Sequence, residues 1–155
     1  MKVDGTEAIN ATRDEVFRLI TDPAVLERAV PGCESLKTTA NGSYDITLKA
    51  GVGSIKGSFA GTIRVENVEA PRHLRMLVDV KGKVGFVKGA GDIDLVESEE
   101  SAESTLVTYS GDVTIGGVIA SVGQQLVLSA AKMMTSRFFS AISAEAGTLY
   151  LRPEL

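Results

Sequence analysis

The hydrophobic pattern of this chain changes its period once, and that change limits the fold more than any other feature. Between Cys33 and Ile115, apolar residues alternate with polar ones, as they do in half-buried β-strands. Residues 118–146 contain no proline, and their apolar residues recur at helical spacing. A helix of that length needs a wide apolar surface beneath it. The pattern therefore predicts a curved antiparallel sheet wrapped around one long C-terminal helix.

Signals for caps and turns define the other elements. Residues 2–9 are expected to form a strand, followed by two short helices. The first helix begins at Thr12, which forms a capping-box pattern with Glu15, and the second begins at Asp22-Pro23. Asn41-Gly42 is a hairpin signal, and about six to seven strands are expected in all. We therefore expect an α+β fold in a single domain over residues 1–155.

Composition and charge exclude several classes of protein. Sixteen basic and twenty acidic side chains give a net charge of −4, which does not suit a nucleic-acid-binding surface. His73 and Cys33 are the only residues of their types, so neither a histidine-centred triad nor a multi-histidine metal site is expected. The N-terminus is charged, and no run approaches the roughly eighteen apolar residues of a membrane span. A cytoplasmic protein is expected.

The glycines of the predicted sheet share the face that should meet the long helix. Gly57 and Gly61 fall in phase with the apolar residues of one strand, and Gly85, Gly89 and Gly91 with those of another. Glycines permit the bends of a curved sheet, and they also leave space between sheet and helix. An empty apolar space of about 300 Å³ would cost about 7 kcal/mol, comparable to the stability of a whole domain. We favour a cavity that a ligand fills, with curvature alone as the alternative.

The same phases identify the side chains that would line such a cavity. We expect a wall formed by residues of four strands and the long helix: Phe59, Ile63, Met76, Phe86, Val87, Tyr109, Leu126, Ala130 and Met133. Phe86 falls on the outward phase, where it would cap the entrance or be an ordinary loop aromatic. Tyr109 brings a hydroxyl that needs a partner, either a backbone carbonyl or a polar group of the ligand. Glu7 shares its phase with Val3 and Ile9, and whether it points inward stays open.

Three sequence blocks, taken in order, carry a family resemblance that runs from the first strand to the long helix. They are Asp22-Pro23 with Val30-Pro31-Gly32-Cys33-Glu34, then Gly51-Val-Gly53-x-x-Lys56-Gly57-x-Phe59-x-Gly61, then Gly85-Phe86-x-Lys88-Gly89. Together they resemble the CoxG family, which is named for carbon monoxide dehydrogenase, in the START-like, Bet v 1-like (SRPBCC) superfamily of helix-grip domains. The resemblance implies a hydrophobic cavity beneath the long helix. It also implies a role in supporting molybdenum-containing carbon monoxide dehydrogenases and related hydroxylases.

We expect a non-catalytic protein that binds a lipophilic ligand, an isoprenoid quinone or a lipid, in this cavity. The implied partners are a molybdenum-containing dehydrogenase and, transiently, the inner face of a membrane, which the apolar tail 148–155 could touch. No metal, covalent cofactor or nucleic acid is expected, and both monomer and homodimer stay open. One alternative is a cyclase- or hydrolase-like enzyme that uses Tyr109, Glu7 or Cys33 in the same cavity. The other is a ligand-free assembly factor with a packed interior.

Overall fold

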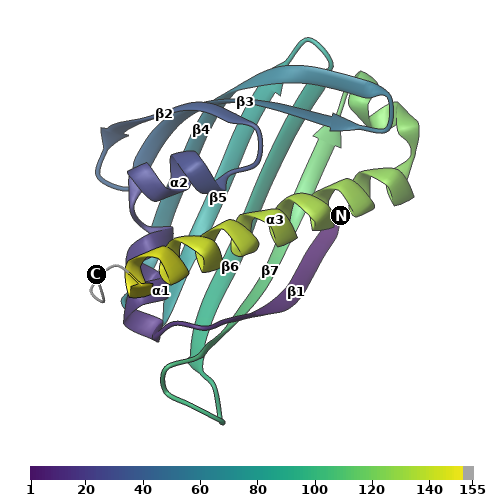
Figure 1. The fold of residues 1–155 in the computed structure, drawn as a ribbon. Coiled ribbons are helices and arrows are strands. Elements are labelled where there is room, and N and C mark those ends of the chain that lie inside the picture. The colour runs from purple at the N-terminus through teal and green to yellow at the C-terminus, as the bar shows by residue number, and fades with distance from the viewer. Residues whose placement is uncertain (152–155) are drawn as a thin grey trace.

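The computed structural model describes residues 1–151, with side chains through Gly147, so the expected contacts of the tail 148–155 lie outside the described side chains. One strand precedes two short helices, six further strands follow, and a 3₁₀ helix leads into one long helix (Figure 1). The elements are β1 (Lys2–Ile9), α1 (Arg13–Ile20), α2 (Pro23–Ala29), β2 (Cys33–Ala40), β3 (Ser43–Val52), β4 (Ile55–Glu69), β5 (His73–Gly82), β6 (Gly85–Glu97), β7 (Thr105–Gly116), η1 (Val118–Val122) and α3 (Gln124–Leu151).

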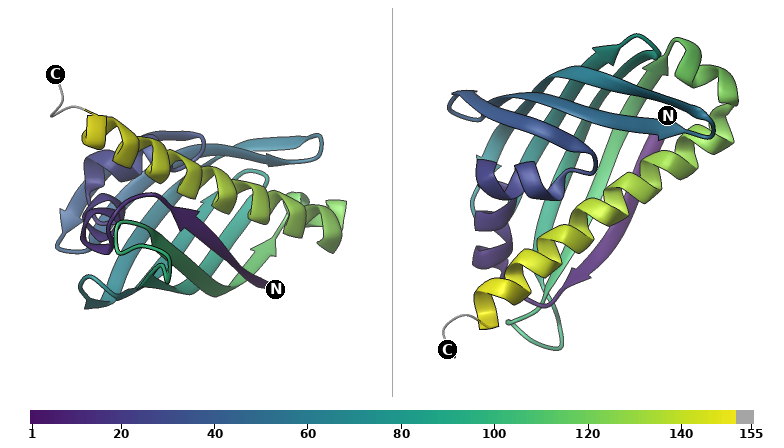
Figure 2. Two further views of the ribbon diagram at one scale, coloured as in Figure 1. Left: turned by 60° about the horizontal axis from the view of Figure 1, so that its bottom comes forward. Right: turned by 45° about the horizontal axis from the view of Figure 1, so that its top comes forward.

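All seven strands form one antiparallel sheet in the order β1-β7-β6-β5-β4-β3-β2. Strands β2 to β7 are a meander in which each strand pairs with the next, and β1 adds to the free edge of β7. The sheet curls, and α3 runs across its concave face (Figure 2). The predicted α+β helix-grip architecture, with two short helices after the first strand, is confirmed.

The two short helices begin where the sequence predicts. The Thr12 side chain accepts a hydrogen bond from the backbone N–H of Glu15 at 3.2 Å, which caps α1. The reciprocal half of the capping box is not formed, because the Glu15 carboxylate pairs with Arg18 at 2.6 Å instead. The Asp22 side chain caps α2 in the same way, with Pro23 at its first position.

The long C-terminal helix begins later than the pattern predicts. Residues Val118–Val122 form a 3₁₀ helix, and Gly123, with a φ of 103°, separates it from α3. Near its other end α3 rests on α1 and α2, and Arg28 of α2 pairs with Glu145 of α3 at 2.6 Å. No helix in the described part of the chain is both long and apolar enough to span a membrane.

The buried side chains form two clusters under the two halves of α3. One cluster packs α1, α2 and the C-terminal half of α3 on β5, β6 and β7, around residues such as Leu19, Leu95 and Ile142. The other packs η1 and the N-terminal half of α3 on β3 and β4, around residues such as Ile119 and Val127. Most buried residues of the second cluster also line the space between the sheet and α3, and this arrangement positions the site described next.

Candidate functional site

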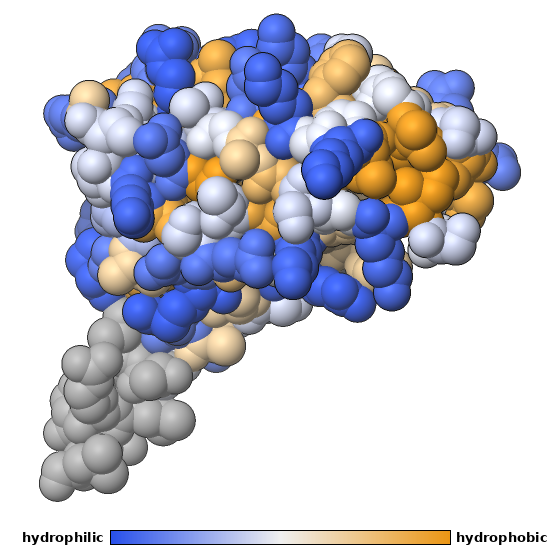
Figure 3. Space-filling model, turned by 90° about the horizontal axis from the view of Figure 1, so that it is seen from above, coloured by the Kyte–Doolittle hydropathy of each residue, from blue (hydrophilic) through white to orange (hydrophobic). Residues whose placement is uncertain are grey.

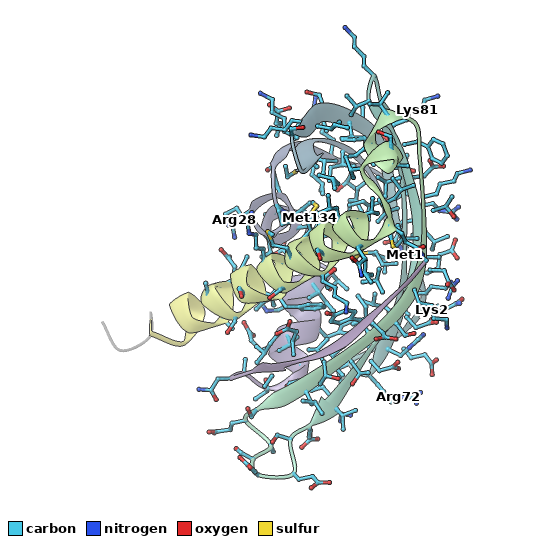
Figure 4. All side chains as sticks on the ribbon, turned by 90° about the vertical axis from the view of Figure 1, so that its right-hand side faces the viewer. Met1, Lys2, Arg28, Arg72, Lys81 and Met134 are labelled. Carbon is cyan, nitrogen blue, oxygen red and sulfur yellow. The ribbon has the colours of Figure 1, made fainter. Side chains whose placement is uncertain are left out.

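A cavity of about 350 Å³ lies between the concave face of the sheet and α3. Its wall comes from six strands, η1, α3, α2 and the segment after α2, and it is almost entirely apolar. Met134 points from α3 into the space between helix and sheet (Figure 4). A volume of this size lies in the range of small-molecule sites.

Small residues face each other across the cavity and account for its volume. On the helix side, Ala130 and Ala131 line it with methyl groups only. On the sheet side, Gly91 of β6 pairs with Gly111 of β7, and Gly89 lies two residues along β6. No long side chain therefore reaches from these positions into the space.

Six of the nine side chains expected in the wall do lie in it. They are Phe59, Ile63, Met76, Val87, Tyr109 and Ala130, and they come from four strands and α3. Alternation along each strand sufficed to find the five strand residues, because successive side chains of a strand point to opposite faces of the sheet. Their role in binding remains a prediction.

The expected placement of three residues is wrong. Leu126 and Met133 lie on the outer side of α3 and are about half exposed, at 52% and 51%. The prediction ran one helical phase through residues 118–146, whereas the break at Gly123 turns α3 so that Val127 and Met134 face inward. Phe86 is 40% exposed on the outer face of β6, with its ring over Gly116, so it does not cap the cavity.

Some of the inward glycines leave cavity space, and others allow neighbouring parts of the chain to pack closely. Gly89 and Gly91 lie in the cavity wall, whereas Gly57, Gly61 and Gly85 do not. A Cβ at Gly61 would collide with the backbone carbonyl oxygen of Asp79, so this glycine allows β4 and β5 to approach closely. At Gly57 a Cβ would meet Val84 at 2.6 Å, and at Gly85 it would meet the Gly116 carbonyl with φ at 142°. The expectation of cavity space at these three positions is therefore wrong.

Several wall residues were missed by reasoning from the sequence. The helix contributes Val127, Met134, Phe138 and Phe139, and the sheet adds Gly111. Gly123 was the available signal for the helix, because a glycine with positive φ often separates two helical segments. Gly111 shares the phase of Tyr109 and Val113, so alternation along its strand was the available signal for it.

Tyr109 is the distinctive polar residue of the wall. Its ring stacks on Phe139 with centroids 5.4 Å apart, and the absence of a side chain at Gly5 leaves room for the phenol. Among the described residues the hydroxyl has no hydrogen-bond partner. Burial, followed by the negative charges of Glu7 and Asp4, raises the pKa of Tyr109, so the hydroxyl keeps its proton as a donor.

Of the other polar candidates, Glu7 lies close enough to Tyr109 for its charge to act on the phenol, whereas Cys33 does not converge with it. Glu7 is half-buried on β1 and Cys33 is half-buried on β2, which form opposite edges of the sheet. Burial, with a smaller contribution from Glu27, raises the pKa of Cys33, which disfavours the thiolate. His73 lies on the outer face, with Nδ1 2.9 Å from a carboxylate oxygen of Asp94.

Comparison with known proteins identifies relatives at two distances. The family model of CoxG, a carbon monoxide dehydrogenase component, matches residues 5–147. A conserved protein from Geobacillus kaustophilus is 31% identical, with 96% of each chain covered and a TM-score of 0.89. A START superfamily protein from Mycobacterium smegmatis, at 12% identity, covers 96% of this chain and 98% of its own, with a TM-score of 0.73. The Zhui aromatase/cyclase from Streptomyces sp. R1128, at 13% identity, covers 95% and 93%, with a TM-score of 0.70.

A search of curated protein sequences found no significant match. The distant structures establish the START-like fold, and the family match extends over nearly the whole chain. Taken with the cavity, they indicate a ligand-binding fold. The chain belongs to the CoxG family of carbon monoxide dehydrogenase components.

Proposed function

We propose that this protein binds one lipophilic ligand, an isoprenoid quinone or a lipid, in the cavity between the sheet and α3. The observation that carries the proposal is the apolar cavity of about 350 Å³ between the sheet and α3. Each methylene group of a ligand that leaves water for this space contributes about 0.8 kcal/mol, so a short hydrocarbon tail already binds usefully.

The cost of the cavity supports a resident ligand. A sealed, dry space of this volume would destabilise the fold by roughly 8 kcal/mol, at about 24 cal/mol per Å³, and this is an upper bound because the cavity is partly open to solvent. That is comparable to the whole free energy of unfolding of a typical domain. The long side chains that would fill it, such as Leu126 and Met133, instead point away from it. A ligand that fills the space would offset this cost.

Tyr109 narrows the chemistry of the ligand. A protonated phenol without a protein partner is a hydrogen-bond donor at a mostly apolar wall, whose other polar residues are Asp92, Ser110 and Thr135. It suits a ligand that is mostly hydrocarbon and carries an acceptor such as a quinone carbonyl or an ester. The wall presents no cation, so a free anionic headgroup would have to remain outside the described cavity.

The proposed cellular role follows from family membership. The family is named for a component of carbon monoxide dehydrogenase. We therefore extend the proposal to a non-catalytic accessory of a molybdenum-containing hydroxylase, which would supply or remove its lipophilic ligand. The proposed place of action is the cytoplasm, including the inner membrane face.

The first test is extraction of the purified protein with organic solvent, with mass spectrometry of the extract and of the intact complex. We expect a quinone or lipid in stoichiometric amount, directly or after incubation with a membrane extract. An empty protein after both treatments would contradict the proposal and favour an assembly factor that acts through its surface.

A matched pair of variants tests the location. Ala130→Phe places a ring in the cavity, whereas Ser136→Phe places the same ring on the exposed side of α3. We expect the first variant to lose the ligand while it stays folded by circular dichroism, and the second to retain it. Equal ligand content in the two would place the ligand elsewhere.

A further inference from the structure

Charge is distributed unevenly along the long axis of the molecule. We call one extremity the η1 end: it consists of the β3–β4 hairpin, the β5–β6 hairpin, η1 and the first turns of α3. Residues 46–61 and 80–91 carry five lysines and neither an acidic residue nor an arginine, and residues 113–131 carry no charge at all. The β6–β7 loop at the other extremity contains four acidic residues and no basic one between Glu97 and Glu103 (Figure 1). The η1 end is therefore cationic although the whole chain is at −4.

The lysines at the η1 end are largely free to meet an external anion. Lys49 lies 3.6 Å from Glu34, and Lys88 lies 4.0 Å from Asp79. Lys56, Lys81 and Lys83 are exposed, and within residues 1–147 none of them has an ion-pair partner. Figure 4 shows Lys81 beside the beginning of α3, far from Arg72.

Exposed apolar side chains accompany these lysines. Val118 of η1 and Leu126 of α3 are 56% and 52% exposed, and Phe86 lies at the same end. Figure 3 shows the largest apolar area of the upper face at this extremity. The cavity extends to the same place, since its wall includes Val52 at the hairpin and Ile119 of η1.

We propose that the η1 end docks on the surface of an anionic phospholipid bilayer. Val118 and Leu126 insert among the headgroups, and Lys56, Lys81 and Lys83 lie against lipid phosphates. Partial insertion of apolar side chains combined with attraction to anionic lipid is the general basis of interfacial binding. The purpose of the contact rests on the proposed function, because a lipophilic ligand would then pass between bilayer and cavity without crossing water.

The composition of the η1 end favours a bilayer over an acidic protein. Protein interfaces are enriched in arginine and depleted in lysine, whereas here every basic side chain is a lysine. A second exposed apolar pair, Val96 and Leu106 on adjacent strands, borders the acidic β6–β7 loop, which an anionic surface would repel. The η1 end is thus the candidate membrane-binding surface, and the end with the β6–β7 loop is the internal control.

The first experiment measures sedimentation of the whole protein with vesicles and needs no cavity ligand. We expect binding to phosphatidylcholine vesicles that contain phosphatidylglycerol, weak binding to phosphatidylcholine alone, and loss of binding as salt is raised. The triple variant Lys56→Glu, Lys81→Glu, Lys83→Glu should bind at least about tenfold more weakly.

A matched triple variant controls for net charge. Lys37→Glu, Arg64→Glu, Arg72→Glu changes the net charge equally but lies away from the η1 end. We expect it to retain clearly more binding than the first triple variant. Equal loss in both would show that only total charge matters and would overturn the proposal.

A fluorescent reporter tests the orientation, because the chain contains no tryptophan. Val118→Trp and Val96→Trp introduce one indole each at positions of nearly equal exposure, 56% and 53%. With anionic vesicles we expect a blue shift and quenching by brominated lipid for Val118→Trp only. Equal responses, or none, would overturn the proposal, as would failure of the wild-type protein to sediment. Either result leaves the extraction test of cavity binding unaffected, so the two proposals can fail separately.

Discussion

At Gly61 a methyl group would overlap the backbone carbonyl of Asp79, whereas at Gly89 it would lie 3.4 Å from Val113, an ordinary contact distance. Both glycines face inward in adjacent parts of one sheet, and the hydrophobic pattern cannot distinguish them. Their difference lies in how closely the neighbouring strand approaches. At the scale of single residues, glycine therefore allows two strands to approach closely at one position and leaves volume at another.

The first prediction compares these two glycines. Gly61→Ala should reduce the free energy of unfolding by about 1–3 kcal/mol, because strands must separate to admit the methyl group. Gly89→Ala should change it by less than about 1 kcal/mol, since its Cβ fits and the unfolded chain loses freedom. Urea denaturation of both variants measures the difference. Equal destabilisation would mean that β4 and β5 do not approach as described.

The second prediction concerns the hydroxyl of Tyr109. Tyr109→Phe should weaken binding of decylubiquinone by a loss of about 0.5–1.5 kcal/mol, the worth of one neutral hydrogen bond. Binding of pyrene, which has no polar atom, should not change. Fluorescence titration measures both, and equal affinities of variant and wild type for decylubiquinone would exclude the proposed hydrogen bond.

The pH dependence of that binding has a definite direction. Burial and nearby carboxylates raise the pKa of Tyr109 above the ordinary phenol value of 10.0, so the donor persists through neutral and mildly alkaline pH. Because the pKa of Tyr109 is higher in the folded than in the unfolded chain, the folded state favours the neutral phenol. This contribution to the free energy of unfolding is fully present below the pKa of the unfolded chain. It is lost as pH rises through the folded pKa. We expect constant decylubiquinone affinity up to about pH 9, and an earlier decline would contradict this account.

At the scale of elements, the sheet was predictable and the helix only partly so. Alternation persists through each strand, so the phase of Phe59 or Val87 follows from its neighbours. The phase of a helix depends on where it begins, and Gly123 restarts α3 after the 3₁₀ turn. The sequence therefore predicted a long apolar helix but assigned Leu126 and Met133 to the wrong side. The cavity was predicted from the glycines, although three of the five named serve curvature.

The third prediction tests the phase of α3 with two adjacent residues. Val127→Asp buries a carboxylate that has no partner and should cost about 3 kcal/mol or more. Leu126→Asp lies in the same helical turn, so the helix dipole acts on both, but its side chain is exposed and the change should stay within about 0.5 kcal/mol. Thermal and urea unfolding measure both. A larger loss for Leu126→Asp would mean that Leu126, and not Val127, faces the sheet.

At the scale of the whole molecule, an interior that contains a cavity is combined with a surface whose charge differs between the two ends. One packed cluster holds the C-terminal half of α3, the other forms much of the cavity wall, and the cationic end of the molecule coincides with one end of that cavity. A protein built in this way should be most stable when it is loaded, because only the folded state offers the space that the ligand fills.

The fourth prediction follows from this coupling. Decylubiquinone at roughly a hundred times its Kd should raise the free energy of unfolding by about 2.7 kcal/mol, and Tm by about 5–10 °C. The reason is mass action: the ligand binds the folded state and finds no cavity in the unfolded chain. In Ala130→Phe the new ring occupies the cavity, so decylubiquinone should not raise the Tm of this variant. In Ser136→Phe the ring lies outside the cavity, so decylubiquinone should raise its Tm as it does for the wild type. Differential scanning calorimetry measures all three. If the wild-type Tm stays constant, or if Ala130→Phe responds equally, the stabilisation does not arise in this cavity.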